Sequence, residues 1–330
     1  MIESRAVINS QAVIDSPAIN LELLSVAVLI PCFNEELTIG KVVRDFRAAI
    51  PWATVHVCDN NSTDRTVEMA RTAGATVRAE GLQGKGNAVR RMFSDIEADI
   101  YVLVDGDDTY DAASALVLVQ RMVAGQYDMV NASRIADAES AYRRGHLLGN
   151  LILTRMVGSI FGNRIRDMLS GYRVLSRRFV KSFPAASAGF EIETELTVHA
   201  LELRMPIDEI GLSYKERPVG SESKLSTFRD GWRILSTIGV LIKDERPLPY
   251  FTMLFALLAT GSILLAAPIV AHFMDTGLVP RFPTAILATG MMLLAFLSLV
   301  CGLVLETVTV GRRESKRMWY LNVSRTASKA

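Results

Sequence analysis

Between residues 26 and 131, short apolar runs alternate with stretches in which apolar positions recur at the spacing of a helix face. The apolar runs are rich in β-branched and aliphatic side chains and end at polar segments, which is typical of buried strands. These predicted strands are residues 26–30, 54–58, 76–78, 100–104 and 129–131, and the predicted helices are residues 38–49, 64–73, 85–96 and 112–124. Alternation at this spacing predicts βαβ units, and therefore an α/β domain with a mainly parallel sheet.

Two long uncharged apolar stretches, residues 250–271 and 283–305, follow in the carboxyl-terminal part of the chain. A helix needs about 20 apolar residues to cross the hydrocarbon core of a bilayer, and each stretch is long enough. The segment between them, residues 272–281, contains Gly277 and Pro280 and predicts a tight loop. We therefore expect a transmembrane hairpin, because two buried core helices of this length are the less favoured alternative.

The basic residues around this hairpin predict its orientation. Lys243 and Arg246 precede the first span, and a basic cluster follows the second, whereas the loop carries Arg281 alone. Because cytoplasmic flanks are enriched in Lys and Arg, we expect both termini and the soluble domain on the cytoplasmic side of the inner membrane. Residues 1–20 lack the continuous apolar core of a signal peptide and are interpreted as a flexible lead-in.

The amino-acid composition narrows the possible classes of function but does not identify one. The 330 residues include 36 Lys and Arg against 35 Asp and Glu, so the net charge of +1 gives no indication of nucleic-acid binding, and none is expected. The three cysteines, Cys32, Cys58 and Cys301, are odd in number and lack metal-ligand spacing, which favours a reducing compartment. The four histidines are too scattered in the sequence to predict a zinc motif.

The carboxylates of Asp105, Asp107 and Asp108 directly follow the predicted strand 100–104. Ligands of open α/β sheets bind at the carboxyl ends of the strands, and clustered carboxylates repel one another unless a cation pairs them. Oxygen ligands on a short loop suit Mg²⁺ or Mn²⁺, which complete their coordination with water and substrate phosphates. The cluster therefore predicts a phosphate-bearing substrate, although Asp-Gly is also ordinary turn chemistry and an acidic surface turn is the alternative.

Polar loops follow the other predicted strands as well. Asp59 ends the second strand, where its carboxylate could accept hydrogen bonds from a base or a ribose hydroxyl. Asp64 is better explained as a helix cap. Lys85, between two glycines at a helix start, is a candidate phosphate contact, although this short motif is weak by itself.

Four motifs follow one another along the chain, namely Pro-Cys-Phe-Asn-Glu-Glu (31–36), Asp-Asn-Asn-Ser-Thr-Asp-Arg-Thr (59–66), Gly-Lys-Gly (84–86) and Asp-Gly-Asp-Asp (105–108). In this order they resemble a family 2 glycosyltransferase. Three later segments are Ser133-Arg134, residues 167–173 and residues 217–224. They are similar to the polyprenyl-phosphate branch of the family, which includes dolichyl-phosphate mannose synthases and bacterial undecaprenyl-phosphate glycosyltransferases. The resemblance covers about residues 26–243, and the terminal hairpin is similar to that of membrane-bound members.

The resemblance implies a Rossmann-like GT-A domain that binds a nucleotide-sugar donor. Pro31, Asn34, Glu35 and Asp59 would lie around the nucleoside, Lys85 would contact the donor, and the metal would join the diphosphate to Asp105 and Asp107. Asp108 is an additional candidate ligand, and which two of the three carboxylates bind the metal stays open. The Gln-x-x-Arg-Trp motif of processive members does not occur in the sequence, which favours transfer of a single sugar.

The resemblance also implies an acceptor, a polyprenyl phosphate. A phosphate monoester has a second pKa of about 6, so it can attack without a general base. Arg134, Arg217 and Lys224 are the basic residues of the matching segments and would hold its phosphate, although each could equally be a solvated surface cation. Asp167 lies where many inverting members contact the acceptor, and it would orient the nucleophile or act as a base. Glu191 and Glu193 are further acidic candidates, which an acidic first helical turn explains almost as well.

Two amphipathic stretches give an independent indication of a membrane surface. Residues 228–242 immediately precede the first span and are predicted to lie on the bilayer, while residues 142–161 could equally pack on the sheet. The predicted organisation is a lead-in (1–25), a catalytic domain (26–227), a juxtamembrane helix and linker (228–248), a two-helix hairpin (249–310) and a basic tail (311–330).

The predicted activity is metal-dependent, inverting transfer of one sugar from a nucleotide-sugar donor to a polyprenyl phosphate. A UDP-sugar is slightly favoured, and GDP-mannose is the alternative donor. The alternative functions are those of a transporter, of a membrane-tethered nucleotide-sugar-binding protein without turnover, and of a glycosyltransferase with a polysaccharide acceptor. Two spans leave little room for a transport pathway. A homo-oligomer is compatible with the sequence.

Overall fold

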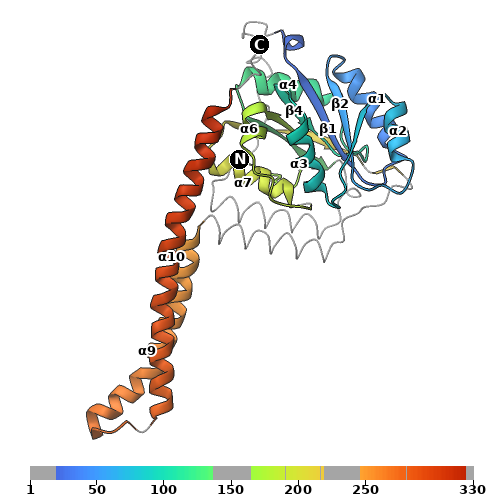
Figure 1. Ribbon diagram of the computed structural model, residues 1–330. Coiled ribbons are helices and arrows are strands. Elements are labelled where there is room, and N and C mark those ends of the chain that lie inside the picture. Colours follow the sequence, from blue (N-terminus) through green and yellow to red (C-terminus); the bar gives the residue numbers. More distant parts are fainter. Residues whose placement is uncertain are drawn as a thin grey trace, which may run out of the picture. The chain divides into compact units, whose positions relative to one another are not determined.

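The computed structural model describes residues 20–136, 165–189, 191–215, 217–218, 246–279 and 281–324 (Figure 1). The chain forms two compact units. One contains the residues up to Ile234 together with those from Lys316 onward, and the other runs from Leu235 to Ser315. The two predicted amphipathic stretches, residues 142–161 and 228–242, lie outside the described residues, as does Lys224.

The first unit is built on a seven-stranded sheet with the strand order β3-β2-β1-β4-β6-β5-β7. Its strands are β1 (Val26–Cys32), β2 (Thr54–Asp59), β3 (Thr76–Ala79), β4 (Ile100–Leu103), β5 (Met129–Ala136), β6 (Arg173–Ser176) and β7 (Ile207–Tyr214). Neighbouring strands are parallel except at β6, which is antiparallel to both β4 and β5. The predicted α/β fold with a mainly parallel sheet is confirmed.

Helices cover both faces of this sheet (Figure 1). On one face, α1, α2 and α4 contact one another or the strands beneath them, and on the other face α3 and α6 pack together over β1, β2 and β4. The elements are η2 (Leu21–Leu23), α1 (Ile39–Ala49), α2 (Thr66–Thr72), α3 (Lys85–Asp95), α4 (Ser114–Ala124), α6 (Arg177–Ser182) and α7 (Ile192–Glu202). The four helices predicted between residues 38 and 124 therefore form, within one or two residues of their predicted ends.

The centre of the sheet is buried on both faces, as its sequence predicts. Every residue of β1 and β4 is buried, and their Val and Ile side chains pack in one cluster with Ile39, Val43 and Phe46 of α1 and Leu118 of α4. Such continuous apolar strands are characteristic of parallel sheets covered by two helical layers. The core therefore fixes the carboxyl ends of β1, β2 and β4 side by side.

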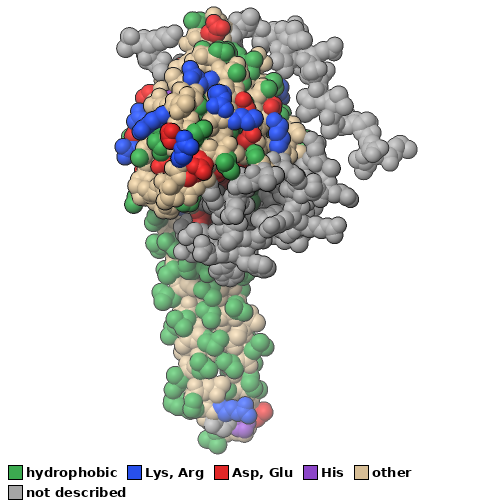
Figure 2. Space-filling view, turned by 90° about the vertical axis from the view of Figure 1, so that its right-hand side faces the viewer, with side chains coloured by type: hydrophobic (Ala, Val, Ile, Leu, Met, Phe, Trp, Pro, Cys, Tyr) green, Lys and Arg blue, Asp and Glu red, His purple; other side chains and the backbone are tan. Residues whose placement is uncertain are grey.

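The second unit consists of two long helices, α9 (Pro247–Thr276) and α10 (Phe282–Asn322), both long and apolar enough to cross a membrane. Their outward-facing side chains are hydrophobic along most of the hairpin (Figure 2), including Leu257 and Leu264 in α9 and Leu293 in α10. So many exposed apolar residues are unstable in water but suit the hydrocarbon core of a bilayer. These helices support membrane association.

The last turns of α10 belong to the first unit and are held there by polar contacts. The hydroxyl of Tyr320 donates a hydrogen bond of 2.6 Å to the fully buried carboxylate of Asp128, and the guanidinium of Arg178 lies 4.7 Å from the centre of the Tyr320 ring. Lys316 forms an ion pair of 2.8 Å with Glu202 at the end of α7. The helix continues well past the predicted span of residues 283–305, because its final turns pack on protein.

Candidate active site

The loops after β1, β2 and β4 meet at one edge of the sheet. Parallel pairing places Cys32 beside Asp59, and the backbone N–H of Asn60 donates a hydrogen bond of 2.8 Å to the carbonyl of Cys32. The chain leaves β4 through Val104 into Asp105, between the loops of its neighbours. The predicted donor-binding motifs therefore lie together at the strand ends, where open α/β sheets bind ligands.

Asp105 lies in a chain of alternating charges. The ammonium group of Lys85, the first residue of α3, forms ion pairs with both Asp105 and Glu193 of α7. The side chains of Lys85 and Glu193 are only 10% and 6% exposed, whereas that of Asp105 is 29% exposed. Burial lowers the pKa of Lys85, but the two carboxylates outweigh burial and raise it overall, so this lysine carries a fixed positive charge.

Two glycines allow α3 and α7 to approach this closely. A Cβ on Gly84 would lie 3.1 Å from the carbonyl carbon of Ala188, and one on Gly86 would lie 2.8 Å from that of Ser187, with the oxygens closer still. Gly84 also has a φ of +131°, a conformation that other residues rarely adopt. The Glu195 carboxylate accepts hydrogen bonds from the backbone N–H groups of Ala186 and Ser187, at 2.9 and 2.8 Å. The Lys85–Glu193 pair thus rests on a fixed backbone.

Asp107 is paired with the predicted acceptor-side arginine. A nitrogen of the Arg217 guanidinium lies 2.6 Å from Asp107 Oδ2, and the Thr109 hydroxyl donates a hydrogen bond of 2.6 Å to Oδ1. Burial and the neighbouring charge of Asp105 raise the pKa of Asp107, while Arg217 opposes that shift. Residues 110 positions apart in the sequence therefore share one charged site.

Asp108 points to a different partner. Its carboxylate accepts a hydrogen bond of 2.7 Å from Lys41 of α1, and its backbone has a φ of +59°. Within the described ranges, no group of three or more His, Cys, Asp or Glu side chains is arranged to share one metal ion. Asp105 and Asp107 are near enough for their charges to interact, and Asp108 is directed towards α1 instead.

The predicted nucleoside-binding residues lie in interlinked loops. The Asn34 side-chain carbonyl accepts a hydrogen bond of 2.8 Å from the N–H of Thr63, which joins the loop after β1 to the loop after β2. Glu35 follows it in the same loop, and its N–H donates a 2.7 Å hydrogen bond to Thr66 of α2. Pro31 is buried within β1, and the largely buried Asp59 accepts a hydrogen bond of 3.3 Å from the N–H of Ser62. Asn34 therefore has a structural contact beside its predicted role.

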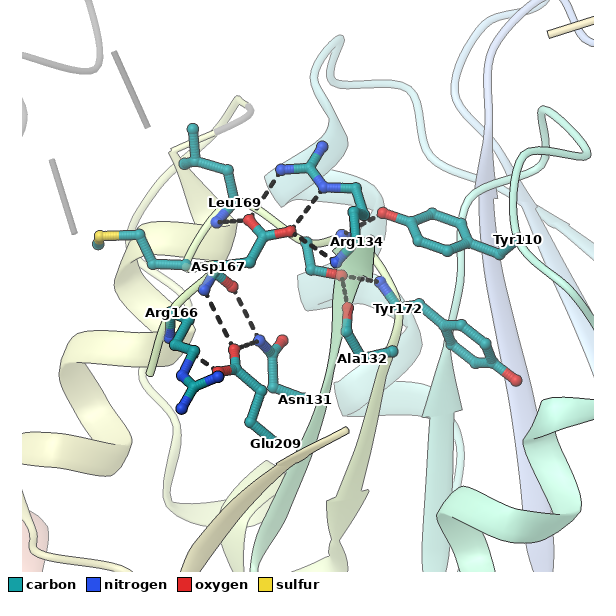
Figure 3. Close-up of polar contacts among 12 residues, drawn as sticks. Tyr110, Asn131, Ala132, Arg134, Arg166, Asp167, Leu169, Tyr172 and Glu209 are labelled. Carbon is teal, nitrogen blue, oxygen red and sulfur yellow. Dashed lines mark hydrogen bonds and ion pairs between the residues drawn. The ribbon is translucent and has the colours of Figure 1, made fainter. Parts of the chain in front are cut away.

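Asp167 and Arg134 form a two-pronged ion pair (Figure 3). The Nε and Nη2 atoms of Arg134 lie 2.7 and 2.8 Å from the two carboxylate oxygens of Asp167, and the Arg134 backbone N–H donates a third contact of 3.1 Å. The guanidinium also lies 5.6 Å from the ring centre of Tyr214. The Asp167 backbone is held in turn by Glu209 and Asn131. The two predicted site residues Arg134 and Asp167 are therefore each other's ion-pair partners.

The segment after Asp167 carries site residues that the sequence did not single out. Arg173 is fully buried and donates hydrogen bonds to the carbonyls of Ser170 and Met168, at 3.0 and 2.7 Å, which fixes the backbone of this loop. Gly171, in the same loop, lies so close to Asp105 that a Cβ there would be 2.8 Å from the carboxyl carbon. The Gly171 N–H donates a hydrogen bond of 2.9 Å to the hydroxyl of Tyr110. In the sequence, only the presence of glycine at position 171 indicates that the backbone there lies close to another group.

Comparison with known proteins agrees with this arrangement. The sequence model of the family described as glycosyl transferase family 2 matches residues 27–183. The chain is 38% identical over 240 residues to the glycosyltransferase AglJ of Haloferax volcanii, a match that covers 72% of this chain and 78% of that protein. The chain belongs to glycosyl transferase family 2. It is therefore a transferase enzyme.

Other relatives of this family 2 enzyme differ in how far they match. An uncharacterised protein of Shigella flexneri is 56% identical over 155 residues, covering 47% of this chain and 95% of that protein. A protein named dolichyl-phosphate hexose transferase, from Haloferax volcanii, is 29% identical over 221 residues, covering 67% of this chain and 95% of that protein.

Solved structures of the same fold include glucosyl-3-phosphoglycerate synthase from Mycobacterium tuberculosis. Its complex with Mn²⁺, uridine diphosphate and glucosyl-3-phosphoglycerate matches with a TM-score of 0.56 at 21% identity, over 68% of this chain and 84% of that one. Its complex with Mn²⁺, UDP-glucose and phosphoglyceric acid also gives a TM-score of 0.56, at 22% identity, over 65% of this chain and 78% of that one. At this identity the match establishes the shared GT-A-like fold.

Proposed function

We propose that this enzyme transfers one sugar from a nucleotide-sugar donor, with a UDP-sugar slightly favoured, to a polyprenyl phosphate, with inversion at the sugar carbon. The observation that carries the proposal is the 2.6 Å ion pair between Arg217 and Asp107. It joins a carboxylate of the donor-side motif to an arginine of the segment that resembles the polyprenyl-phosphate branch. A donor diphosphate and an acceptor phosphate bound beside these two residues would be neighbours.

The residues at the strand ends fit a divalent metal. Asp105 and Asp107 offer carboxylate oxygens only, and their mutual repulsion, part of the cause of the raised pKa of Asp107, is what a cation relieves. Two carboxylates are enough for Mg²⁺ or Mn²⁺, which take their other ligands from water and substrate phosphates. When bound, such an ion neutralises the charge that grows on the leaving diphosphate. We assign Asp105 and Asp107 as the ligands and Asp108 to the contact with Lys41.

Lysine and arginine side chains of the site would bind the phosphate groups of the donor and the acceptor. Lys85 presents a buried positive charge at the start of α3, suited to the donor diphosphate. Arg217 would turn from Asp107 to the acceptor phosphate, and an arginine binds phosphate with two parallel hydrogen bonds. Because a phosphate monoester is already largely dianionic near neutrality, none of these residues has to remove a proton from it.

Arg134 and Asp167 are assigned a shared role in holding the acceptor. The two-pronged contact fixes the guanidinium of Arg134 in one orientation and leaves the carboxylate of Asp167 fully engaged. A carboxylate in this state is a better orienting group than a general base. Asp167 therefore supports Arg134, and Arg134 faces the acceptor phosphate.

A lipid acceptor is supported by features outside the site. The apolar helices α9 and α10 supply membrane association, and one relative is named as a dolichyl-phosphate hexose transferase. The excess of Lys and Arg at the two outer ends of the hairpin favours a cytoplasmic location for the catalytic unit, where nucleotide sugars are available.

The test is transfer by the purified full-length protein. Undecaprenyl phosphate is combined with labelled UDP- and GDP-sugars in Mg²⁺ or Mn²⁺, and again with EDTA. We expect one donor to yield a chloroform-soluble sugar that forms only with metal. Water-soluble polymer would favour a polysaccharide acceptor, and an unconsumed donor that still binds would favour a binding protein without turnover.

Asp107→Asn tests the assigned metal ligand in the same assay. The amide keeps the shape of the side chain but removes its charge, so we expect turnover to fall by about 1,000-fold or more. The matched control is Asp95→Asn, which removes a partly exposed carboxylate at the end of α3 that pairs with Arg91 at 2.7 Å and with Arg78 at 3.1 Å. Equal rates in the Asp107 variant and the control would contradict the metal assignment.

A further inference from the structure

Glu193 is a buried acid that the proposed transfer chemistry leaves without a task. Its side chain is 6% exposed, and it lies in the first turn of α7, in contact with Lys85. Lys85 in turn contacts Asp105, so a single ammonium group is shared between a buried carboxylate and one that is partly open to solvent. Burying an acid is costly unless its charge is used or compensated.

The backbone around Glu193 is built to keep this contact. The close approach of Gly84 and Gly86 to residues 187 and 188, and the N–H of Asn87 donating to the carbonyl of Ala188 at 3.3 Å, fix the start of α3 against the segment before α7. Glu195, in the same first turn of α7, holds that segment through both of its carboxylate oxygens. Two acids two residues apart thus have separate tasks: Glu195 binds backbone, and Glu193 binds the lysine.

We propose that Glu193 is a positioning residue that divides the charge of Lys85, so that Asp105 stays available to a divalent metal. The inference rests on the proposed function of the site. A lysine paired with Asp105 alone would neutralise that carboxylate and compete with a metal for its oxygens. Glu193 draws the lysine towards the protein interior and limits this competition.

This role has a signature that a structural role lacks, because two binding constants change in opposite directions. In Glu193→Gln, Lys85 turns fully to Asp105, and we expect the dissociation constant for Mn²⁺ to rise about tenfold, since one neighbouring charge commonly changes a binding equilibrium by at least that factor. The same substitution removes one negative charge, so the net charge beside the diphosphate position becomes more positive by one. In EDTA, UDP should therefore bind roughly threefold to tenfold more tightly than to the wild type.

The experiment uses the full-length protein in detergent. Mn²⁺ binding is measured from the electron paramagnetic resonance signal of free Mn²⁺, and UDP binding is measured by calorimetry in EDTA, with GDP run in parallel. The matched control is Glu202→Gln, which removes an acid at the end of α7 whose side chain is also buried but pairs with Lys316 instead of Lys85. The control should leave both constants within twofold of the wild type, with a lower melting temperature as its only change.

Four results would overturn the proposal. Unchanged Mn²⁺ and UDP binding in Glu193→Gln would show that Glu193 does not control how Lys85 interacts with Asp105. Weaker binding of both ligands, together with a lower melting temperature, would show that Glu193 only stabilises the fold. Unchanged binding with a collapse in turnover would make Glu193 a catalytic residue instead. A wild-type protein that bound neither Mn²⁺ nor UDP nor GDP would refute the proposed function itself, and the inference with it.

Discussion

Gly171→Ala is the substitution that reports most directly on the geometry of Asp105. Gly171 is buried against Asp105, and an added Cβ would lie 2.8 Å from its carboxyl carbon and 2.9 Å from Oδ1. Gly171 does not have a positive φ, so alanine fits its backbone without strain. The obstacle to the methyl group is therefore the carboxylate itself.

The size of the effect follows from this overlap. Non-bonded carbon atoms prefer separations of about 3.5–4.0 Å, so the carboxylate has to move by roughly 1 Å. A displacement of that size at a catalytic group costs about 100-fold in rate, or about 2.7 kcal/mol of transition-state stabilisation. The cost in folding stability should be smaller, about 1 kcal/mol, since the Asp105 side chain is 29% exposed and free to shift outward.

The assay is kcat/KM for the donor, together with the melting temperature. We expect kcat/KM to fall about 100-fold while the melting temperature falls by only a few degrees. The control is Gly40→Ala in α1, where the nearest atom to the new Cβ is 3.5 Å away; it should keep wild-type activity and gain up to about 1 kcal/mol in stability. Wild-type activity in Gly171→Ala would refute the assignment of Asp105 to the reacting site.

Two further predictions concern other parts of the molecule. Arg217→Ala should lower kcat/KM for the lipid phosphate by about 100-fold or more, because the acceptor phosphate loses a cation. Mn²⁺ should still bind, because the substitution leaves Asp107 in place. Normal transfer kinetics would contradict the assignment of Arg217 to the acceptor phosphate. His199, buried among Phe179, Phe183 and Ser182, has a pKa lowered by burial to about 3. Below pH 6.5 the unfolded chain therefore binds a proton at His199 that the folded protein does not bind. The free energy of unfolding should fall by about 2 kcal/mol between pH 6.5 and 5 for this reason. The variant His199→Gln should not show this loss. Parallel pH profiles of melting temperature for the two proteins would contradict this.

The parallel part of the sheet was predictable because its strands are continuous apolar runs. The first five predicted strands all form, and the ends of β1, β2 and β4 carry the motifs as expected. The antiparallel strand β6 was missed, since it begins with a charged residue, Arg173, whose burial depends on partners elsewhere in the chain. The edge strand β7 was missed as well; only three of its eight residues, Ile207, Ile210 and Leu212, are aliphatic.

The sequence indicates candidate site residues but not the contacts among them. Lys85 and Asp105 belong to separate motifs, and an acidic first helical turn explains Glu193 almost as well in the sequence, whereas the contact of Glu193 with Lys85 depends on how α3 and α7 pack. The pairing of Arg217 with Asp107 joins residues 110 positions apart, and no local pattern encodes it. Such contacts depend on long-range packing, which hydrophobic periodicity does not specify.

The mass of the lipid product tests the central claim most directly. Purified enzyme, the donor that it consumes, undecaprenyl phosphate and Mn²⁺ are incubated, and the chloroform phase is analysed by mass spectrometry. The account predicts one product, heavier than the lipid by a single sugar residue and still carrying one phosphate, with the complete nucleoside diphosphate released. A lipid with a second phosphate, or with a ladder of several sugars, would contradict transfer of one sugar to the acceptor phosphate.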